Sequence, residues 1–204
     1  MVKLKYALLS WGYAERLCRK VAKQVLEDDF KAEKIVALAK GGWFASMLLS
    51  DYLDVEVVSL NPRSDEKILA KKALLVDDFI STGKTMRKAM KRVEGEVKTS
   101  ALLMFQTSDF VPDYLGEYIS DDIWIIFPWN VVENLSALIL RILEKGENDI
   151  WGIRSTLFSE FGIDSIALET IHPSKLEEIL EVLEKRGSVE KFSDSGRIYW
   201  RLRK

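Results

Sequence analysis

Two adjacent carboxylates, Asp77 and Asp78, follow a short apolar run, and a loop of small polar residues comes soon after them. The run Ala73–Val76 has no polar break, which is typical of a strand buried in a parallel sheet. The loop Ser81–Thr85 carries three hydroxyls, a glycine and a lysine, and a helical pattern begins at Met86. The N–H groups of such a loop can converge on a phosphate, and carboxylates can accept hydrogen bonds from ribose hydroxyls. These residues in this order indicate a site for a phosphorylated sugar.

The stretch Val76–Thr85, VDDFISTGKT, resembles the phosphoribosyl-diphosphate motif of the type I phosphoribosyltransferases. It is not a Walker loop, because the Gly-x-x-x-x-Gly-Lys-Ser/Thr spacing is absent. The resemblance implies a glycosyltransferase acting on a pentosyl group, in which Asp77 and Asp78 are catalytic. Both would hold the ribose and lie near a Mg²⁺ ion bound through substrate and water. The 5′-phosphate would be bound by the loop residues Ser81, Thr82, Gly83, Lys84 and Thr85.

A second glycine-containing turn is expected upstream of the acidic pair. The predicted strand Lys34–Ala39 runs directly into Lys40, Gly41 and Gly42, and a helical pattern follows from Trp43. Glycines at a strand-to-helix turn let the backbone approach a ligand closely. In type I phosphoribosyltransferases this turn binds the diphosphate, so the resemblance implies diphosphate contacts from Ala39 to Gly42. It also implies a non-proline cis peptide bond at Ala39 or Lys40.

The stretch Asp122–Asn130, DIWIIFPWN, resembles the base-binding segment of the 6-oxopurine phosphoribosyltransferases, above all the xanthine–guanine type. The resemblance implies that Trp124 stacks on a purine and that the Ile125 carbonyl faces the Watson–Crick edge of that purine. Packing of Trp124 in a core strand is the alternative interpretation. Gln106 and Thr107, at the end of another predicted strand, are further candidates for base contacts.

The predicted pocket departs from the 6-oxopurine pattern. Ser81 stands where those enzymes usually carry an acid, and Asn130 replaces the acid of the xanthine–guanine type. No lysine or arginine occurs between Thr99 and Asn130, so a 6-oxo group would lack its charged donor. Gln106 or Thr107 can instead accept from a 6-amino group. Because an unpaired buried polar group costs about 1–3 kcal/mol, we expect adenine to be preferred, giving AMP in purine salvage. Transfer to hypoxanthine, guanine or xanthine is the alternative.

The segment Asn61–Lys72 is polar and includes Lys67 and Lys71. The resemblance implies a mobile lid here whose basic residues bring charge to the leaving diphosphate. A solvated loop with no role in binding is the alternative.

The chain is long enough for one ordinary domain with a small appendage, and the resemblance implies an α/β protein. The chain has 204 residues, is 48% hydrophobic and carries a net charge of −2, which gives no general case for binding nucleic acid or membranes. The single cysteine, Cys18, fits a reducing compartment, so we expect a cytoplasmic protein. We expect a mostly parallel sheet of four or five strands flanked by helices. We also expect a homodimer whose small-molecule partners are phosphoribosyl diphosphate and a purine.

Residues 1–146 are predicted to form the phosphoribosyltransferase domain, and residues 147–204 a separate helical module. The module is predicted to contain three helices and a hairpin, the composition of a winged helix-turn-helix. Its third helix, Pro173–Arg186, presents glutamates at 177, 178, 181 and 184, which disfavours contact with phosphates. We therefore expect a module that packs on the catalytic domain or across a dimer. A phosphoribosyl-diphosphate-sensing regulator that binds DNA is the alternative function.

Overall fold

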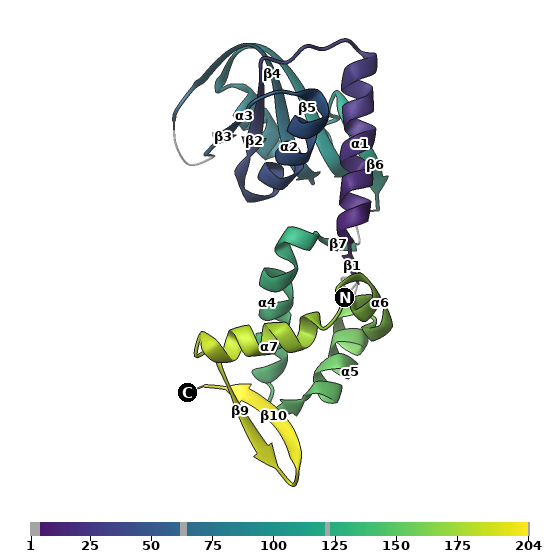
Figure 1. The fold of residues 1–204 in the computed structure, drawn as a ribbon, viewed down its shortest axis with the longest axis vertical. Coiled ribbons are helices and arrows are strands. Elements are labelled where there is room, and N and C mark those ends of the chain that lie inside the picture. Colours follow the sequence, from purple (N-terminus) through teal and green to yellow (C-terminus); the bar gives the residue numbers. More distant parts are fainter. Residues whose placement is uncertain (1–4, 62–64, 121–122, 204) are drawn as a thin grey trace. The chain divides into compact units, whose positions relative to one another are not determined.

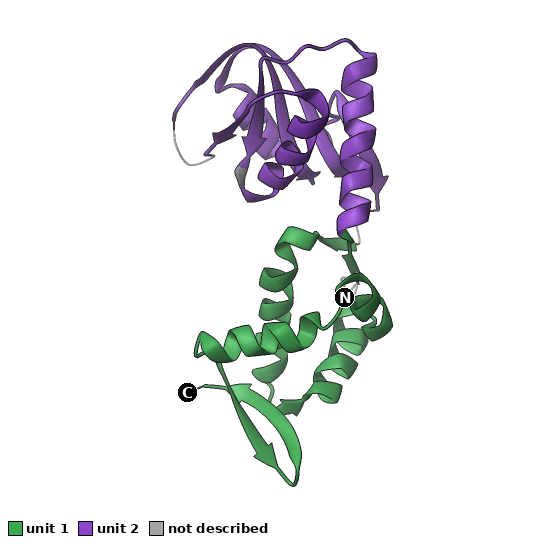
Figure 2. Ribbon diagram, in the orientation of Figure 1, with its two compact units in different colours: residues 1–10, 122–204 green, residues 11–121 purple. Residues whose placement is uncertain are grey.

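The computed structural model describes residues 5–61, 65–120 and 123–203. The chain forms two compact units, residues 11–121 and residues 1–10 with 122–204 (Figure 2). The second unit therefore begins well before residue 146, where the sequence suggested a domain boundary. The reason is that the helix preceding residue 146 shares an apolar core with the helices that follow it.

The unit of residues 11–121 is built on a parallel sheet of five strands in the order β3-β2-β4-β5-β6 (Figure 1). Its elements in chain order are α1 (Trp11–Glu27), β2 (Lys34–Leu38), α2 (Ala39–Leu53), β3 (Val57–Leu60), β4 (Ile68–Ile80), α3 (Lys84–Met90), β5 (Val93–Phe105) and β6 (Tyr114–Ile119). The α/β class and the parallel sheet flanked by helices are thus as the sequence predicted.

Both faces of this sheet are covered. In β2, Ile35, Val36 and Ala37 are all fully buried, although successive side chains of a strand point to opposite faces. A continuous apolar run is what a parallel strand between helices requires. Helix α1 contributes Cys18 to the core, and burial raises the pKa of its thiol to about 12, which marks a packing residue.

Two segments expected to be irregular are strands instead. Strand β4 begins at Ile68, so the second half of the expected lid pairs with β5. Lys67 forms an ion pair with Glu94 at 2.7 Å. Residues 62–64 lie outside the described residues. Pro112 and Gly116 favour an irregular stretch between residues 107 and 121, but strand β6 fills part of it.

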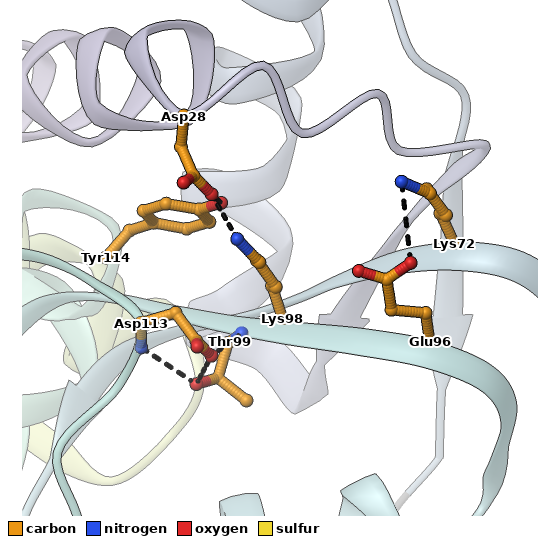
Figure 3. A network of polar contacts seen from close by, with 7 residues as sticks. All are labelled: Asp28, Lys72, Glu96, Lys98, Thr99, Asp113 and Tyr114. Carbon is orange, nitrogen blue, oxygen red and sulfur yellow. Dashed lines mark hydrogen bonds and ion pairs between the residues drawn. The ribbon is translucent and has the colours of Figure 1, made fainter.

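A polar network ties the end of α1 to β5 and β6 (Figure 3). Asp28 accepts hydrogen bonds from Lys98 and from the hydroxyl of Tyr114, the latter at 2.6 Å. These two bonds hold the pKa of Asp28 below its ordinary value. Nearby, the Thr99 hydroxyl donates to the Asp113 carboxylate at 2.8 Å. The network fixes α1 against the sheet at the end opposite the strands' carboxyl termini.

The other unit pairs β1 (Lys5–Leu8) in parallel with β7 (Ile123–Ile126). The remaining elements are η1 (Pro128–Asn130), α4 (Val131–Leu143), β8 (Asn148–Asp149), α5 (Ile150–Phe161), α6 (Ser165–Ile171), α7 (Lys175–Lys185), β9 (Val189–Asp194) and β10 (Arg197–Leu202). Helix α4 shares one apolar core with α5 and α7, and β9 and β10 form the predicted hairpin, with β8 on its edge. Among the described residues, no helix is long and apolar enough to cross a membrane.

Candidate active site

The predicted phosphate-binding loops meet at the carboxyl edge of the parallel sheet. From β2 the chain passes through α2 to β3 on one side, and then crosses to β4 on the other side of β2. The crevice between two strands whose connections leave in opposite directions is where open α/β sheets bind ligands. Gly41 and Gly42 follow β2 at this point, and Asp77 and Asp78 lie near the end of β4.

The glycine pair lies directly against the acidic pair. An ideal Cβ on Gly41 would lie 2.0 Å from the Asp78 carboxylate, and one on Gly42 would lie 2.5 Å from the Val76 carbonyl oxygen. Only glycine permits this approach of the helix start to β4. Residues predicted from two separate motifs are therefore neighbours.

The expected turn at residues 40–42 is instead the first turn of helix α2, which begins at Ala39. The described backbone contains no cis peptide bond, so the cis bond implied at Ala39 or Lys40 is not found. Leu38 occupies the N-cap, and its apolar side chain cannot accept hydrogen bonds from the first N–H groups of the helix. The first turn also carries no acidic residue. Those N–H groups and the positive end of the helix dipole favour an anion.

The two carboxylates are close together in a largely desolvated position. Asp78 is only 9% exposed, and its N–H donates to Oδ1 of Asp77 at 3.0 Å. Burial, followed by repulsion from Asp78, raises the pKa of Asp77 well above its ordinary value. Each of these effects is relieved when a cation or the hydroxyls of a ligand approach the pair.

The carboxylates suit Mg²⁺ held chiefly through a substrate. Among the described residues, no group of three or more His, Cys, Asp or Glu side chains can hold a metal ion. Proteins commonly bind Mg²⁺ through one or two carboxylates together with substrate phosphates and water. Asp77 and Asp78 provide the hard oxygen donors that such a site needs.

The loop after β4 presents its polar side chains to solvent. Ser81, Thr82, Lys84 and Thr85 are exposed, whereas Gly83 is buried with a φ of 71°. This left-handed conformation favours glycine, and an ideal Cβ here would also lie 2.1 Å from the Cβ of Phe110. The loop therefore offers three hydroxyls and a cation at the same sheet edge as Asp78.

The base-binding candidates fall in both units. Gln106 and Thr107 are exposed in the turn that follows β5, at the carboxyl edge of the sheet. Trp124 and Ile125 lie in β7 of the other unit. Trp124 is 52% exposed and its indole N–H donates to Oδ1 of Asn134 at 3.1 Å, so it is not packed in a core.

Sequence reasoning missed two residues beside the phosphate-binding loop, Arg87 and Phe110. Arg87 donates to the carbonyl oxygens of Thr82 and Asp109. Phe110 packs against Gly83. No spacing in the sequence marks these contacts, because they join α3 to a loop that follows the next strand.

No family model matches the chain. The xanthine-guanine phosphoribosyltransferase of Desulfotalea psychrophila is 22% identical over 147 residues, covering 65% of this chain and 91% of the relative. That of Idiomarina loihiensis is 24% identical over 140 residues, covering 60% of this chain and 86% of the relative.

Two solved structures are similar to this chain in fold. The purine phosphoribosyltransferase of Pyrococcus horikoshii superposes with a TM-score of 0.51 at 27% identity, covering 61% of this chain and 94% of that one. The xanthine-guanine-hypoxanthine phosphoribosyltransferase of Helicobacter pylori gives a TM-score of 0.56 at 22% identity, covering 65% and 99%. More than a third of this chain is outside each of these structural matches.

Proposed function

We propose that this protein, a purine phosphoribosyltransferase by its motif, fold and relatives, transfers the phosphoribosyl group of phosphoribosyl diphosphate to a 6-oxopurine. A ring nitrogen of the base would attack C1 of the ribose and lose its proton to solvent while diphosphate departs, giving a nucleoside monophosphate. The observation that carries the proposal is the contact of Gly41 with the Asp78 carboxylate. That contact brings a helix start suited to an anion next to a carboxylate pair suited to a ribose.

Each part of the site has a role in this reaction. Asp77 and Asp78 would accept from the ribose hydroxyls and stabilise the positive charge that develops at C1. Residues Ser81–Thr85 would bind the 5′-phosphate, and the first N–H groups of α2 would stabilise the departing diphosphate. Mg²⁺, when bound with the substrate, would neutralise part of the diphosphate charge. Catalysis by this arrangement rests on positioning and electrostatics.

The relatives favour a 6-oxopurine over adenine. The two relatives reported above are xanthine-guanine enzymes, and neither supports the adenine preference expected from Ser81 and Asn130. Adenine is retained as the second candidate for one reason: residues 99–130 contain no lysine or arginine to donate to a 6-oxo group. A main-chain N–H or a water molecule would then have to serve as that donor.

The test is nucleotide formation from phosphoribosyl diphosphate, Mg²⁺ and each of four purines, with products identified by mass. We expect kcat/KM for guanine, hypoxanthine or xanthine to exceed that for adenine by at least tenfold, since sites built on hydrogen bonds discriminate strongly. A preference for adenine would support the second candidate. No nucleotide with any purine, under conditions in which the protein remains folded, would refute both.

We propose further that the protein is a homodimer and that residues 147–204 serve packing rather than reading DNA. On α7, Glu177 pairs with Arg154 at 2.8 Å, and Glu181 is exposed. An acidic helix face repels phosphates. Sedimentation equilibrium tests the first statement, and a single species of monomer mass would refute it.

A further inference from the structure

One side chain joins the two loops at the carboxyl edge of the sheet. The guanidinium of Arg87, on α3, donates to the carbonyl oxygen of Thr82 at 3.0 Å and to that of Asp109 at 2.7 Å. Its carbon lies 5.3 Å from the centre of the Phe110 ring. Thr82 belongs to the proposed 5′-phosphate loop, and Asp109 and Phe110 closely follow the base-binding candidates.

The two loops also touch directly. Gly83 packs on Phe110 so closely that an ideal Cβ would lie 2.1 Å from the Cβ of that residue. The second loop has a defined shape of its own, because Ser108 N–H donates to the Phe105 carbonyl at 3.2 Å and Phe110 N–H donates to the Ser108 hydroxyl at 3.3 Å. Movement of either loop would therefore be transmitted to the other.

We propose that Arg87 is a positioning residue that couples the 5′-phosphate loop to the segment carrying Gln106 and Thr107, so that order in one loop requires order in the other. The inference rests on the proposed function, because it gives each loop a substrate. A planar guanidinium can donate to two carbonyls in a fixed geometry, whereas a lysine presents one point charge on a flexible stem. The geometry of Arg87, and not only its charge, is what the coupling needs.

The kinetic test compares Arg87→Met and Arg87→Lys with Lys91→Met, which removes an exposed cation just past the end of the same helix. We expect KM for phosphoribosyl diphosphate and KM for the base each to rise about tenfold in Arg87→Met, the cost of losing charge-assisted hydrogen bonds. Arg87→Lys should show most of the same rise in both KM values, although it keeps the charge. Both KM values of Lys91→Met should stay within twofold of wild type. The proposal would be overturned if Arg87→Lys had wild-type KM values. It would also be overturned if Arg87→Met raised KM for phosphoribosyl diphosphate alone.

A second readout does not depend on turnover. Hydrogen exchange can be measured by mass spectrometry on the unliganded proteins. In Arg87→Met, the peptides covering residues 81–86 and 106–110 should both exchange faster than in wild type. Lys91→Met should change neither peptide. Unchanged exchange at residues 106–110 in a folded Arg87→Met protein would overturn the coupling even if the wild type proves inactive as a transferase. Coupled exchange in a protein without transferase activity would instead refute only the proposed function.

Discussion

Replacing Gly41 with alanine should disable the site while leaving the fold nearly as stable as before. The added Cβ would start 2.0 Å from Oδ2 of Asp78, and ordinary contact begins near 3.4 Å, so the carboxylate must retreat by about 1.4 Å. A misplacement of about 1 Å in a catalytic group can cost about 100-fold in rate. We therefore expect kcat to fall about 100-fold.

The stability change should be small because two effects oppose each other. Forcing Asp78 from its preferred rotamer costs about 0.5–1.5 kcal/mol. Alanine in a helix is favoured over glycine by about 0.5–1 kcal/mol. The net change in the free energy of unfolding should lie within about 1 kcal/mol of zero. In an Asp78→Ala background the collision is absent, so Gly41→Ala should become stabilising there.

The assay is nucleotide formation with the preferred purine. It is paired with urea unfolding of the wild type, Gly41→Ala, Asp78→Ala and the double mutant, which together form a double-mutant cycle. Gly12→Ala is the matched control, because Gly12 also lies in the first turn of a helix and a Cβ there meets nothing within 4 Å. Its activity should stay within twofold of wild type. The reasoning is refuted if Gly41→Ala keeps more than a third of wild-type turnover, or if its effect on stability is the same with and without Asp78.

The remaining predictions concern Asp77 and the other unit. Asp77→Asn should lower turnover at least tenfold yet raise the thermal midpoint at neutral pH. The pKa of Asp77 is raised in the fold, so its ionised form destabilises the protein at high pH. The gain in thermal midpoint from Asp77→Asn should therefore vanish as the pH falls to the ordinary carboxyl range near 4. A gain in midpoint that persists at acid pH contradicts this. Truncation after Gly146 should lower the thermal midpoint and solubility, because it strips α5 and α7 from the core they share with α4. An equally stable truncated protein would show an independent module. The full chain should not bind duplex DNA below micromolar concentrations at physiological salt, and sub-micromolar binding would favour the regulator.

The fold follows from the sequence where local pattern decides the structure. The apolar runs of β2 and β4 and the amphipathic α1 were predictable, because burial on both faces or on one face leaves a clear periodicity. The polar first half of β4 was not predictable. Lys72 on β4 and Lys67 just before it resemble loop residues, but they pair with glutamates on β5 at 3.4 and 2.7 Å. Such cross-strand pairing is a tertiary property that a single stretch does not reveal.

The site was predictable to the level of motifs and not to the level of contacts. The sequence predicted that Asp77 and Asp78 share one site with a glycine turn. In the structure Gly41 lies against Asp78, which is consistent with that prediction. It could not indicate that α2 begins at Ala39, because two glycines argue against a helix start on propensity alone. The roles in base binding stay predictions, since Gln106 and Trp124 belong to different units.

A purely structural explanation of the acidic motif would describe it as a strand that ends in a solvated acidic turn before a capped helix. Neither half of that description holds. Asp78 is 9% exposed beside a second carboxylate, an arrangement that burial and repulsion make costly for folding. The N-cap of α3 is Gly83, which provides no side-chain acceptor. The hydroxyls of Ser81 and Thr82 therefore do not cap α3 from the N-cap position. A chain that keeps two costly carboxylates and an exposed row of hydroxyls at one sheet edge is better explained by a ligand that binds at that edge.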